Sequence, residues 1–599
     1  MTSSEHDTGA ERPERRTLIW RAVLGLIQGL VLYVLAEVAK SHVWPGNDAQ
    51  VFAPLLLLFA LLPPALITGV SHLPLRRLLS WSAGLAVIVV LMAHHDAWRA
   101  AEEVGLNHTA NVFPSPLVSF FSAVFVFIAY VLIRAGESDH RWLAAYETYF
   151  DTSWKLAVQL QFSALFVGAF WAVLWIGAGL FNLIGLDFLS RLLIKTWFAL
   201  PATAAAFATA LHLTDVRPGM VRSIRNLLLT LQSWLLPLLT LILGGFLASI
   251  PFTGLDSLWK TRHAASLLLG VAATLVILIN TVYQHGKKGQ EVIPVLRYSA
   301  RIACGLLLPL VALAAYAVAL RVNQYGLSKD RVIAIACLIV ATCYAAGYGW
   351  AAVSRREWLA PVALCNVLTS WCVLAVLVAL FTPIADPSRL ATNSQLAQLA
   401  SGRITADKFD FAYLRFDTAR YGREALERLS KEGAGPDPAR IKEMAAKALA
   451  LKNKWDRSPP TLSAVDVTAN IRMQTPGANL PKEFAAIRWG EVSTQRWMLP
   501  NCLTTANATC DAYLLPLIDG GRGELLLVPE RGTGAVFVQG ADGAWSHVAQ
   551  LPATENCPTV RDALKAGTHR LAAPKLRDIE INGQRVHLQP INSKSELCK

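Results

Sequence analysis

Charged residues are scarce in this chain of 599 residues. They account for 16% of the sequence, whereas a soluble domain usually carries about 25%. The deficit falls in the first two thirds, where long apolar runs alternate with short polar segments. Much of the net charge of +13 lies in these short segments, as it does in the cytoplasmic loops of membrane proteins. The composition therefore favours a membrane protein and indicates no nucleic-acid partner.

Motifs that would carry catalysis or bind a metal are also missing. The sequence contains no GxSxG, and no CxxC or HxxxH spacing. No pair of acidic residues and no series of proton-relay residues stands out in the apolar runs, which weakens an ion-coupled transporter. His94, His95 and Asp96 invite a metal reading, but adjacent histidines on a helix point in different directions. We interpret them as a polar helix end among lipid headgroups, and we expect no catalytic residue, cofactor or metal.

Eleven segments are long and apolar enough to cross a bilayer, which takes about 20 residues. The first run is too long for the core of a signal peptide, and no small-residue cleavage site follows it. We therefore predict a mainly α, polytopic transmembrane bundle, followed by a soluble α+β domain that ends in a β-rich module. The expected spans are approximately 18–38, 51–70, 78–95, 116–134, 160–182, 193–213, 232–251, 264–284, 303–321, 332–352 and 360–381.

The distribution of Lys and Arg predicts the orientation. With residues 1–17 as a cytoplasmic tail, the cytoplasmic side receives eighteen Lys and Arg and the other side nine. Eleven crossings then place the C-terminus outside, which in a bacterium is the periplasm. The predicted parts are this tail, a bundle over 18–381, a periplasmic helical segment over 382–457 and a periplasmic β-rich module over 458–599.

The soluble part contains four cysteines, Cys502, Cys510, Cys557 and Cys598. An even number fits disulfides in an oxidising compartment, and four cysteines allow three pairings. We favour Cys502–Cys510 with Cys557–Cys598, because the first pair closes a short loop. Four unrelated thiols remain the alternative.

Several polar features lie within or between the apolar runs. Asp187, Arg191 and Lys195 share one helical face, and we interpret residues 181–201 as an interfacial elbow, with a polar gate or ligand pocket as the alternative. Trp142, Tyr146, Phe150 and Trp154 form an amphipathic stripe, which predicts a helix on the cytoplasmic membrane surface that leads into the fifth span. The uncharged polar residues are expected to bond to neighbouring helices. They are Gln28, Gln159, Gln161 and Asn280.

The stretch Leu320–Val340 is interpreted as a turn between two spans. Gly326 can adopt the left-handed conformation that ends a helix. Ser328 can cap the next helix. Local chemistry explains this polar stretch without a substrate.

The same stretch carries a resemblance to a known family. It overlaps the segment "YSARIACGLLLPLVALAAYAVALRVNQYGLSKDRV". This segment resembles the closing hairpin of bacterial membrane proteins grouped as domain of unknown function 4153. "WAVLWIGAGLFNLIGLDFLSRLL" and "SQLAQLASGRITADKFDFAYLRFDTARYGREALERL" are similar to its middle and following segments, so the resemblance covers roughly residues 20–430. It implies a bacterial inner-membrane protein and supplies no catalytic residue. The family-like turn residues are Tyr325, Gly326, Leu327, Ser328 and Arg331.

After residue 458 the sequence changes to short apolar runs separated by Gly- and Asp-rich turns, which predicts a meander of strands. Asn582-Gly583 between two alternating arms predicts a hairpin. We expect a non-enzymatic inner-membrane protein whose periplasmic domain binds an envelope partner or senses a signal. The alternative is a transporter or a lipid-handling membrane enzyme with its site within the bundle.

Overall fold

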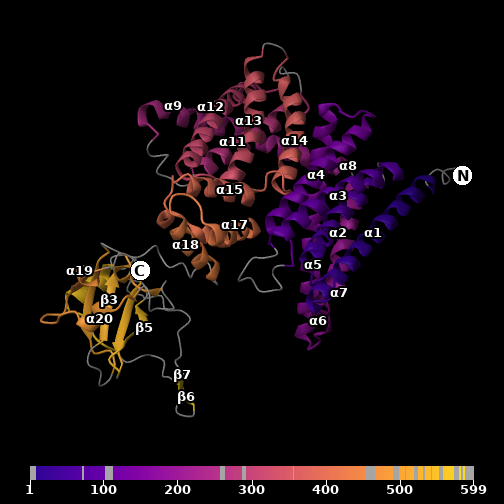
Figure 1. Ribbon diagram of the computed structural model, residues 1–599. Coiled ribbons are helices and arrows are strands. Elements are labelled where there is room, and N and C mark those ends of the chain that lie inside the picture. The colour runs from indigo at the N-terminus through magenta and orange to yellow at the C-terminus, as the bar shows by residue number, and fades with distance from the viewer. Residues whose placement is uncertain are drawn as a thin grey trace. The chain divides into compact units, whose positions relative to one another are not determined.

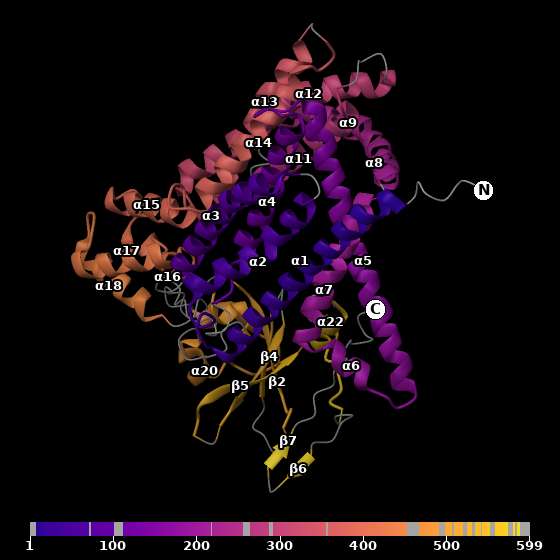
Figure 2. The same cartoon turned by 90° about the vertical axis from the view of Figure 1, so that its right-hand side faces the viewer.

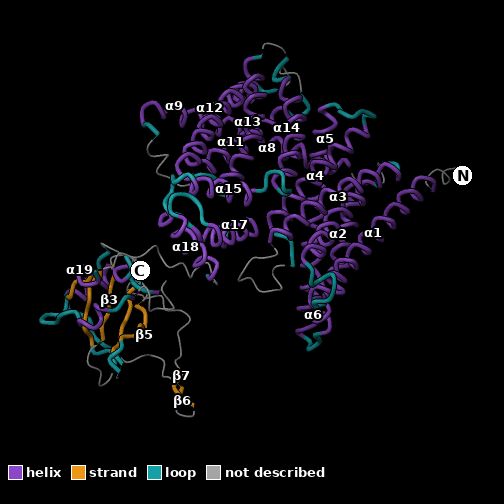
Figure 3. The backbone as a smooth tube through the Cα atoms, viewed as in Figure 1, coloured by secondary structure: helices purple, strands orange, loops and turns teal. Residues whose placement is uncertain are grey.

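The chain forms two compact units, Met1–Arg457 and Ser458–Lys599, in the computed structural model (Figure 1). Strands occupy only the second unit among the residues that are described (Figure 3). The described residues are 8–70, 73–100, 112–216, 218–255, 264–286, 292–354, 357–451, 466–489, 498–505, 508–518, 524–529, 533–540, 542–551, 558–572, 579–581 and 584–586.

Among the described residues of the first unit, eleven stretches of helix are long and apolar enough to cross a membrane. This confirms the predicted polytopic bundle and places the unit in a lipid bilayer. The seventh span, Val221–Thr253, joins α8 (Pro218–Ser233) to α9 (Leu235–Thr253). The other ten lie in α1 (Thr8–Ser41), α2 (Ala49–Gly69), α3 (Leu75–Ala100), α4 (Pro116–Ser138), α5 (Tyr146–Leu183), α7 (Thr196–Val216), α11 (Ala264–Tyr283), α12 (Pro294–Tyr325), α13 (Lys329–Val353) and α14 (Pro361–Leu380).

Contacts between span ends sort these ends into two faces. At one face, which we call the N-side face, the start of α1 meets the end of α7, since Arg21 pairs with Asp215 at 2.8 Å. The start of α3 meets the end of α4 there through Arg77 and Glu137. At the opposite, C-side face, the end of α1 meets the start of α7 through Lys40 and Thr196. This alternation is the one expected of a chain that crosses the bilayer at every span.

Two glycines let α1 and α7 approach closely. A Cβ atom on Gly25 would lie 2.6 Å from the Cβ of Ala208, and one on Gly29 would lie 2.3 Å from the Cα of Pro201. Glycines four residues apart in an apolar helix are a recognised means of close helix packing in membranes. Any larger side chain at these two positions would push the helices apart.

Gln28 of α1 compensates for two prolines within α2. Pro63 and Pro64 lack an N–H, which leaves the carbonyl groups of Phe59 and Ala60 without their helical donors. The side-chain amide of Gln28 donates to both carbonyl oxygens, at 3.1 and 3.2 Å. The bond to a neighbouring helix predicted for Gln28 is thus present. It gives hydrogen-bond donors to two backbone carbonyl groups that lipid could not satisfy.

The helix predicted on the membrane surface before the fifth span is not separate. Helix α5 begins at Tyr146 and runs without a break to Leu183. The aromatic stripe turns toward protein, because Tyr146 contacts Tyr283 of α11 and Phe150 is buried beside His285. Trp142 precedes the helix and is 87% exposed. Packing against α11 therefore replaces the expected contact with headgroups.

The predicted elbow over 181–201 consists of a short helix between two spans. Helix α6 (Phe188–Leu193) follows Asp187, which forms an ion pair with Arg191. Lys195 lies just beyond α6, before α7 begins at Thr196. Of the three residues predicted to share one helical face, only Arg191 therefore lies within α6, while Asp187 precedes the helix and Lys195 follows it.

Four helices and a short 3₁₀ turn follow the last span and pack around their own core (Figure 1 and Figure 2). Two of the helices start with an acidic cap followed by proline, Asp386-Pro387 and Asp437-Pro438, a sequence suited to the first turn. Leu414 and Leu426 are fully buried in this core. The elements are α15 (Pro387–Ala400), η2 (Ala406–Lys408), α16 (Phe411–Phe416), α17 (Ala419–Glu432) and α18 (Pro438–Ala450).

The second unit is built on a five-stranded sheet of order β1-β2-β3-β4-β5. The predicted meander is β2 to β5, all antiparallel, whereas β1 pairs with β2 in parallel and was not expected from the sequence. Phe484 and Phe537 are fully buried in the core. The strands are β1 (Ile471–Met473), β2 (Cys510–Leu515), β3 (Glu524–Pro529), β4 (Gly534–Gln539) and β5 (Trp545–Leu551).

Smaller elements complete the second unit. The predicted hairpin is β6 (Ile579–Ile581) paired with β7 (Gln584–Val586), as a separate two-stranded sheet. Its turn residues, Asn582 and Gly583, lie outside the described residues. The helical elements are α19 (Val467–Asn470), α20 (Lys482–Ala486), η4 (Asn501–Leu503) and α22 (Pro558–Lys565).

Candidate functional site

A charged cluster, the Asp386 cluster, fixes the segment after the last span to the C-side face. Asp386 is fully buried, and its Oδ1 accepts from the backbone N–H groups of Ser388 and Arg389 at the start of α15. Its Oδ2 accepts from His95 Nε2–H at 2.9 Å and lies 3.5 Å from Arg99 Nη1. One carboxylate therefore caps α15 and holds it against the end of α3.

The surrounding charges determine the protonation of Asp386. Burial by itself would raise the pKa of this carboxyl, but the hydrogen bond from His95 and the charge of Arg99 outweigh burial and hold the pKa below its ordinary value. Arg99 also pairs with Asp96 at 2.6 Å, and Asp96 accepts from the N–H and the hydroxyl of Ser115 at the start of α4. The Asp386 cluster thus joins α3, α4 and α15.

The family-like turn is a second attachment point on the C-side face. Gly326 ends α12 with φ +70°, and Ser328 caps α13 by accepting from the N–H of Arg331, as the sequence predicts. A Cβ on Gly326 would lie 1.6 Å from Gln398 Nε2, because α15 packs directly on the turn. The Leu327 N–H donates to Ser394 Oγ at 3.0 Å.

The remaining residues of the turn complete this contact. The guanidinium of Arg331 donates to the carbonyl of Gly326 at 2.7 Å and lies over the ring of Tyr325. The N–H of Lys329 donates to the hydroxyl of Tyr413, in α16. The turn is therefore a docking point for the following helices as well as a connection between spans.

A second charged cluster, the Asp215 cluster, lies at the N-side face. Asp215 at the end of α7 accepts from Arg21 of α1 and Lys155 of α5, each at 2.8 Å. Arg21 is 2% exposed, and this carboxylate compensates its buried charge. Gln159, one of the uncharged polar residues singled out in the sequence, donates to the same carboxylate at 3.4 Å. The cluster joins three spans that are remote in sequence.

A third group of polar side chains carries no charge, and we call it the amide cluster. Asn366 of α14 donates to Asn280 of α11 at 2.6 Å and to the hydroxyl of Tyr146 at 3.1 Å. Tyr348 of α13 donates to the side-chain oxygen of Asn366 at 2.7 Å and accepts from Asn280 at 2.8 Å. Tyr146 donates to Asn280 at 3.2 Å. Four side chains thus join four helices with bonds that close on themselves.

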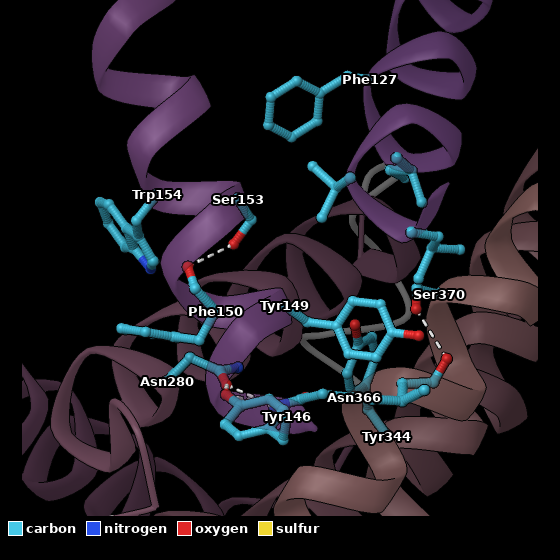
Figure 4. A pocket seen from close by; sticks show the side chains of 14 residues that line it. Phe127, Tyr146, Tyr149, Phe150, Ser153, Trp154, Asn280, Tyr344, Asn366 and Ser370 are labelled. Carbon is cyan, nitrogen blue, oxygen red and sulfur yellow. Dashed lines mark hydrogen bonds between the residues drawn. The ribbon is translucent and has the colours of Figure 1, made fainter. Parts of the chain in front are cut away.

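A cavity of about 230 Å³ lies beside the amide cluster (Figure 4). Its apolar walls come from α4 and α5, and Figure 4 shows these side chains converging on one space with Asn280 and Asn366 at one end. The described residues that line it carry no formal charge. They are Phe127, Ile128, Val131, Leu132, Tyr146, Tyr149, Phe150, Ser153, Trp154, Asn280, Tyr344, Asn366, Val367 and Ser370.

The predicted cysteine pairing falls partly within the described residues. Cys502 and Cys510 form a disulfide, with their Cα atoms 5.8 Å apart, in the core of the second unit. Cys557 and Cys598, the other predicted pair, lie outside the described residues.

The polar stretch at the end of α3 is the largest departure from the sequence analysis. His94 and His95 do diverge, since His94 contacts the carbonyl of Gln50 while His95 reaches Asp386. His95 and Asp96 are buried among protein groups, however, and do not face headgroups as expected. The sequence around His95 gives no sign of this contact, because its partner Asp386 lies 291 positions further along the chain. No group of three or more His, Cys, Asp or Glu residues in the described chain is arranged to hold a metal.

Comparison with known families decides the relationship. The family model described as domain of unknown function (DUF4153) matches residues 55–429, more than half of the chain. The chain belongs to this family. No curated protein and no solved structure matches it. The DUF4153 match runs beyond the last span into α17, so the docked helices α15 and α16 belong to the family region, while Ser458–Lys599 lies outside it.

Proposed function

We propose that this DUF4153 protein is a bacterial inner-membrane anchor that holds its C-terminal domain in the periplasm, where the domain binds an envelope partner or senses a signal. The observation that carries the proposal is the docking of α15 on the C-side face through Asp386 and the Gly326 turn. A segment fixed at two points holds the chain that leads to Ser458–Lys599 against the C-side face as far as α18.

Two features support the periplasmic side. The N-terminus and the loops that belong with it hold eighteen Lys and Arg against nine in the other loops, which favours a cytoplasmic N-side face. The disulfide Cys502–Cys510 fits an oxidising compartment, because cytosolic thiols are kept reduced. The parts of the chain would then be the tail 1–17, the bundle 18–381, the helical segment 382–457 and the β-rich module 458–599.

Reporter fusions after Lys599 test the orientation. Alkaline phosphatase, which folds only after export, is expected to be active there, and green fluorescent protein, exported unfolded, is expected to be dark. The matched control places each reporter after Glu357, in the loop between α13 and α14, where the activities should reverse. A fluorescent fusion after Lys599 would overturn the proposed orientation.

A partner is tested by cross-linking in intact cells. The full chain is compared with a chain that ends at Arg457 and keeps the complete family region. Envelope proteins captured by the full chain and lost with the shorter one support partner binding by the C-terminal unit. The same captured proteins with both chains would contradict it.

A ligand site within the bundle is the second candidate function, and the cavity beside the amide cluster favours it. The hydroxyls of Ser153 and Ser370 donate to backbone carbonyls, so neither is arranged as an activated nucleophile. The lining therefore suits binding, as in a transporter or a lipid-handling protein, better than hydrolysis.

A further inference from the structure

The cavity lies between two groups of helices within the first unit. The helices α4 and α5 pack with the N-terminal spans, and α11, α13 and α14 form the core of the C-terminal spans. Sites between helices of a bundle are common positions for small-molecule ligands. The junction of the two groups of helices is therefore a suitable position for a small-molecule ligand.

The depth of the cavity matches one leaflet of a bilayer. Asn280 lies three residues before the end of α11, and Asn366 lies five residues after the start of α14, so the amide cluster is about 5–8 Å from the N-side span ends. Phe127 lies eleven residues before the end of α4, about 16 Å from the same side. The hydrocarbon core is about 30 Å thick, so the cavity extends from near headgroup level to the midplane.

The lining is more polar at the shallow end than near the midplane. Tyr149, Asn280 and Asn366 lie at the shallow end. Phe127 and Ile128 lie about 15–16 Å from the N-side span ends, and two hydroxyl residues, Tyr344 and Ser370, lie about 14 Å from them.

The side-chain amides of Asn280 and Asn366 donate within the amide cluster and to the Val276 carbonyl. Tyr149 and Tyr344 also line the cavity, and their hydroxyls take no part in those bonds. Tyr149 accepts from the Ala144 N–H, which leaves its O–H hydrogen for donation to a ligand.

The absence of charge among the described lining residues selects the ligand class. A phosphate or carboxylate in this position would need a cation, and an amine would need a carboxylate. The nearby Asp151 is already paired with Arg225 and His285. The volume of about 230 Å³ is below the roughly 300–1,000 Å³ of pockets that enclose a whole drug-sized ligand, so it suits part of a longer molecule.

We propose that this cavity binds the glycerol end and the adjoining part of one acyl chain of an uncharged lipid of the diacylglycerol class. Its glycerol hydroxyl meets the hydroxyl of Tyr149 at the shallow end, an ester carbonyl meets the deeper hydroxyl of Tyr344, and its chain lies along α4. The proposal rests on the second candidate function, a ligand site within the bundle.

Photo-cross-linking of the purified full chain in phosphatidylcholine vesicles tests the proposal. The probe is a diacylglycerol with a diazirine in one acyl chain, and labelled peptides are identified by mass spectrometry. Labelling is expected on the segment Phe127–Leu132, with most of it lost in Ser370→Phe, which fills the cavity. The matched control is Ser266→Phe on the exposed face of α11, which should label like the wild type.

A second variant guards against misfolding of Ser370→Phe. Tyr344→Phe removes only a hydroxyl, and it is expected to lower labelling roughly two- to tenfold, the effect of one lost hydrogen bond. Unchanged labelling of Phe127–Leu132 in Tyr344→Phe and in a folded Ser370→Phe would overturn the site.

The headgroup is tested separately with a phosphatidylcholine probe that carries the same diazirine chain. Equal labelling of Phe127–Leu132 by both probes would overturn the uncharged class and leave a lipid site in the bundle. Failure of both probes to label the cavity would overturn lipid binding there, and with it this proposal, while a site for a ligand other than a lipid would still be compatible with the second candidate function. Weaker labelling by the charged probe is the result expected.

Discussion

The Asp386 cluster and the amide cluster both join helices that are remote in sequence, but they differ in charge and in position. The Asp386 cluster uses carboxylates and a guanidinium, and it lies where α3, α4 and α15 begin or end. The amide cluster uses two asparagines and two tyrosines, which lie within five residues of the N-side ends of α5, α11, α13 and α14. Both clusters thus lie near span ends, where desolvation of polar groups costs less than at the bilayer centre, but one lies at the C-side face and is charged while the other lies toward the N-side face and is neutral.

This difference has an energetic consequence. Removing one partner of a buried charged group leaves the other charges uncompensated, which costs about 3–5 kcal/mol. Hydrogen bonds between membrane helices contribute about 0.6 kcal/mol on average, and at most about 1.7 kcal/mol, in measured cases. The charged clusters are therefore expected to tolerate substitution poorly, and the amide cluster is expected to tolerate it well.

The largest effect is expected for Asp386→Ala. This change removes the cap of α15 and leaves Arg99 without one of its two carboxylates, so the free energy of unfolding should fall by about 3–5 kcal/mol. Denaturant titration of the purified protein in mixed micelles measures it. Asp386→Asn keeps a side chain that can cap α15, so its free energy of unfolding should fall by less. A fall below about 0.5 kcal/mol for Asp386→Ala would contradict the stabilising role of the Asp386 cluster.

A smaller effect is expected for Asp215→Ala. Arg21 is almost fully buried, but Lys155 is 28% exposed and can turn to water, so the loss should be about 1.5–3 kcal/mol. The same titration tests it. The double variant Asp215→Ala with Arg21→Met should recover part of the loss, because it removes the uncompensated charge. A double variant that is less stable than Asp215→Ala would argue against this explanation.

Acid should weaken the Asp386 cluster in a defined direction. The pKa of Asp386 in the folded protein lies below its ordinary value of 3.8, because the contributions of His95 and Arg99 outweigh burial. Its stabilising effect is therefore fully present above pH 3.8 and is lost as the pH falls through the lowered pKa. The difference in melting temperature between the wild type and Asp386→Asn should therefore shrink toward zero in that pH range. A difference that stays constant down to pH 2 would contradict the prediction.

The smallest effect is expected for Asn366→Leu. Leucine is close in size and removes the hydrogen bonds to Asn280, Tyr146 and Tyr348. At about 0.6 kcal/mol for each of these three bonds, the loss should be about 1–2 kcal/mol. The loss should not change with pH, because no member is charged at neutral pH. A loss above 3 kcal/mol in the same micelle titration would place the amide cluster in the same class as the charged ones.

The sequence predicts the features that depend on neighbouring residues. Apolar length predicts the eleven spans, the Gly326 and Ser328 pattern predicts the turn, and the short loop between Cys502 and Cys510 favours their pairing. Short apolar runs separated by Gly- and Asp-rich turns predict β2 to β5. These features are local because length, turn geometry and strand periodicity are properties of consecutive residues.

The contacts that build the candidate site are long-range and could not be predicted in this way. Asn366 meets Asn280 across 86 positions and Tyr146 across 220. In the sequence, each of these residues is compatible with an ordinary helix or a membrane interface, so none of them by itself indicates its distant partners. A signal for one missed contact was present, since Gly25 and Gly29 have the spacing of close helix pairs, but the partner helix is not encoded in that spacing.

The glycine surface of α1 also bears on the order of events during biosynthesis. Its partner α7 begins at Thr196, so α1 leaves the ribosome long before the helix that covers Gly25 and Gly29 exists. Lipid or a chaperone must occupy that surface until the sixth span arrives and displaces it. Assembly of the two helices is therefore a late, post-insertion step, and a ribosome stalled before residue 196 would expose a groove that the finished protein conceals.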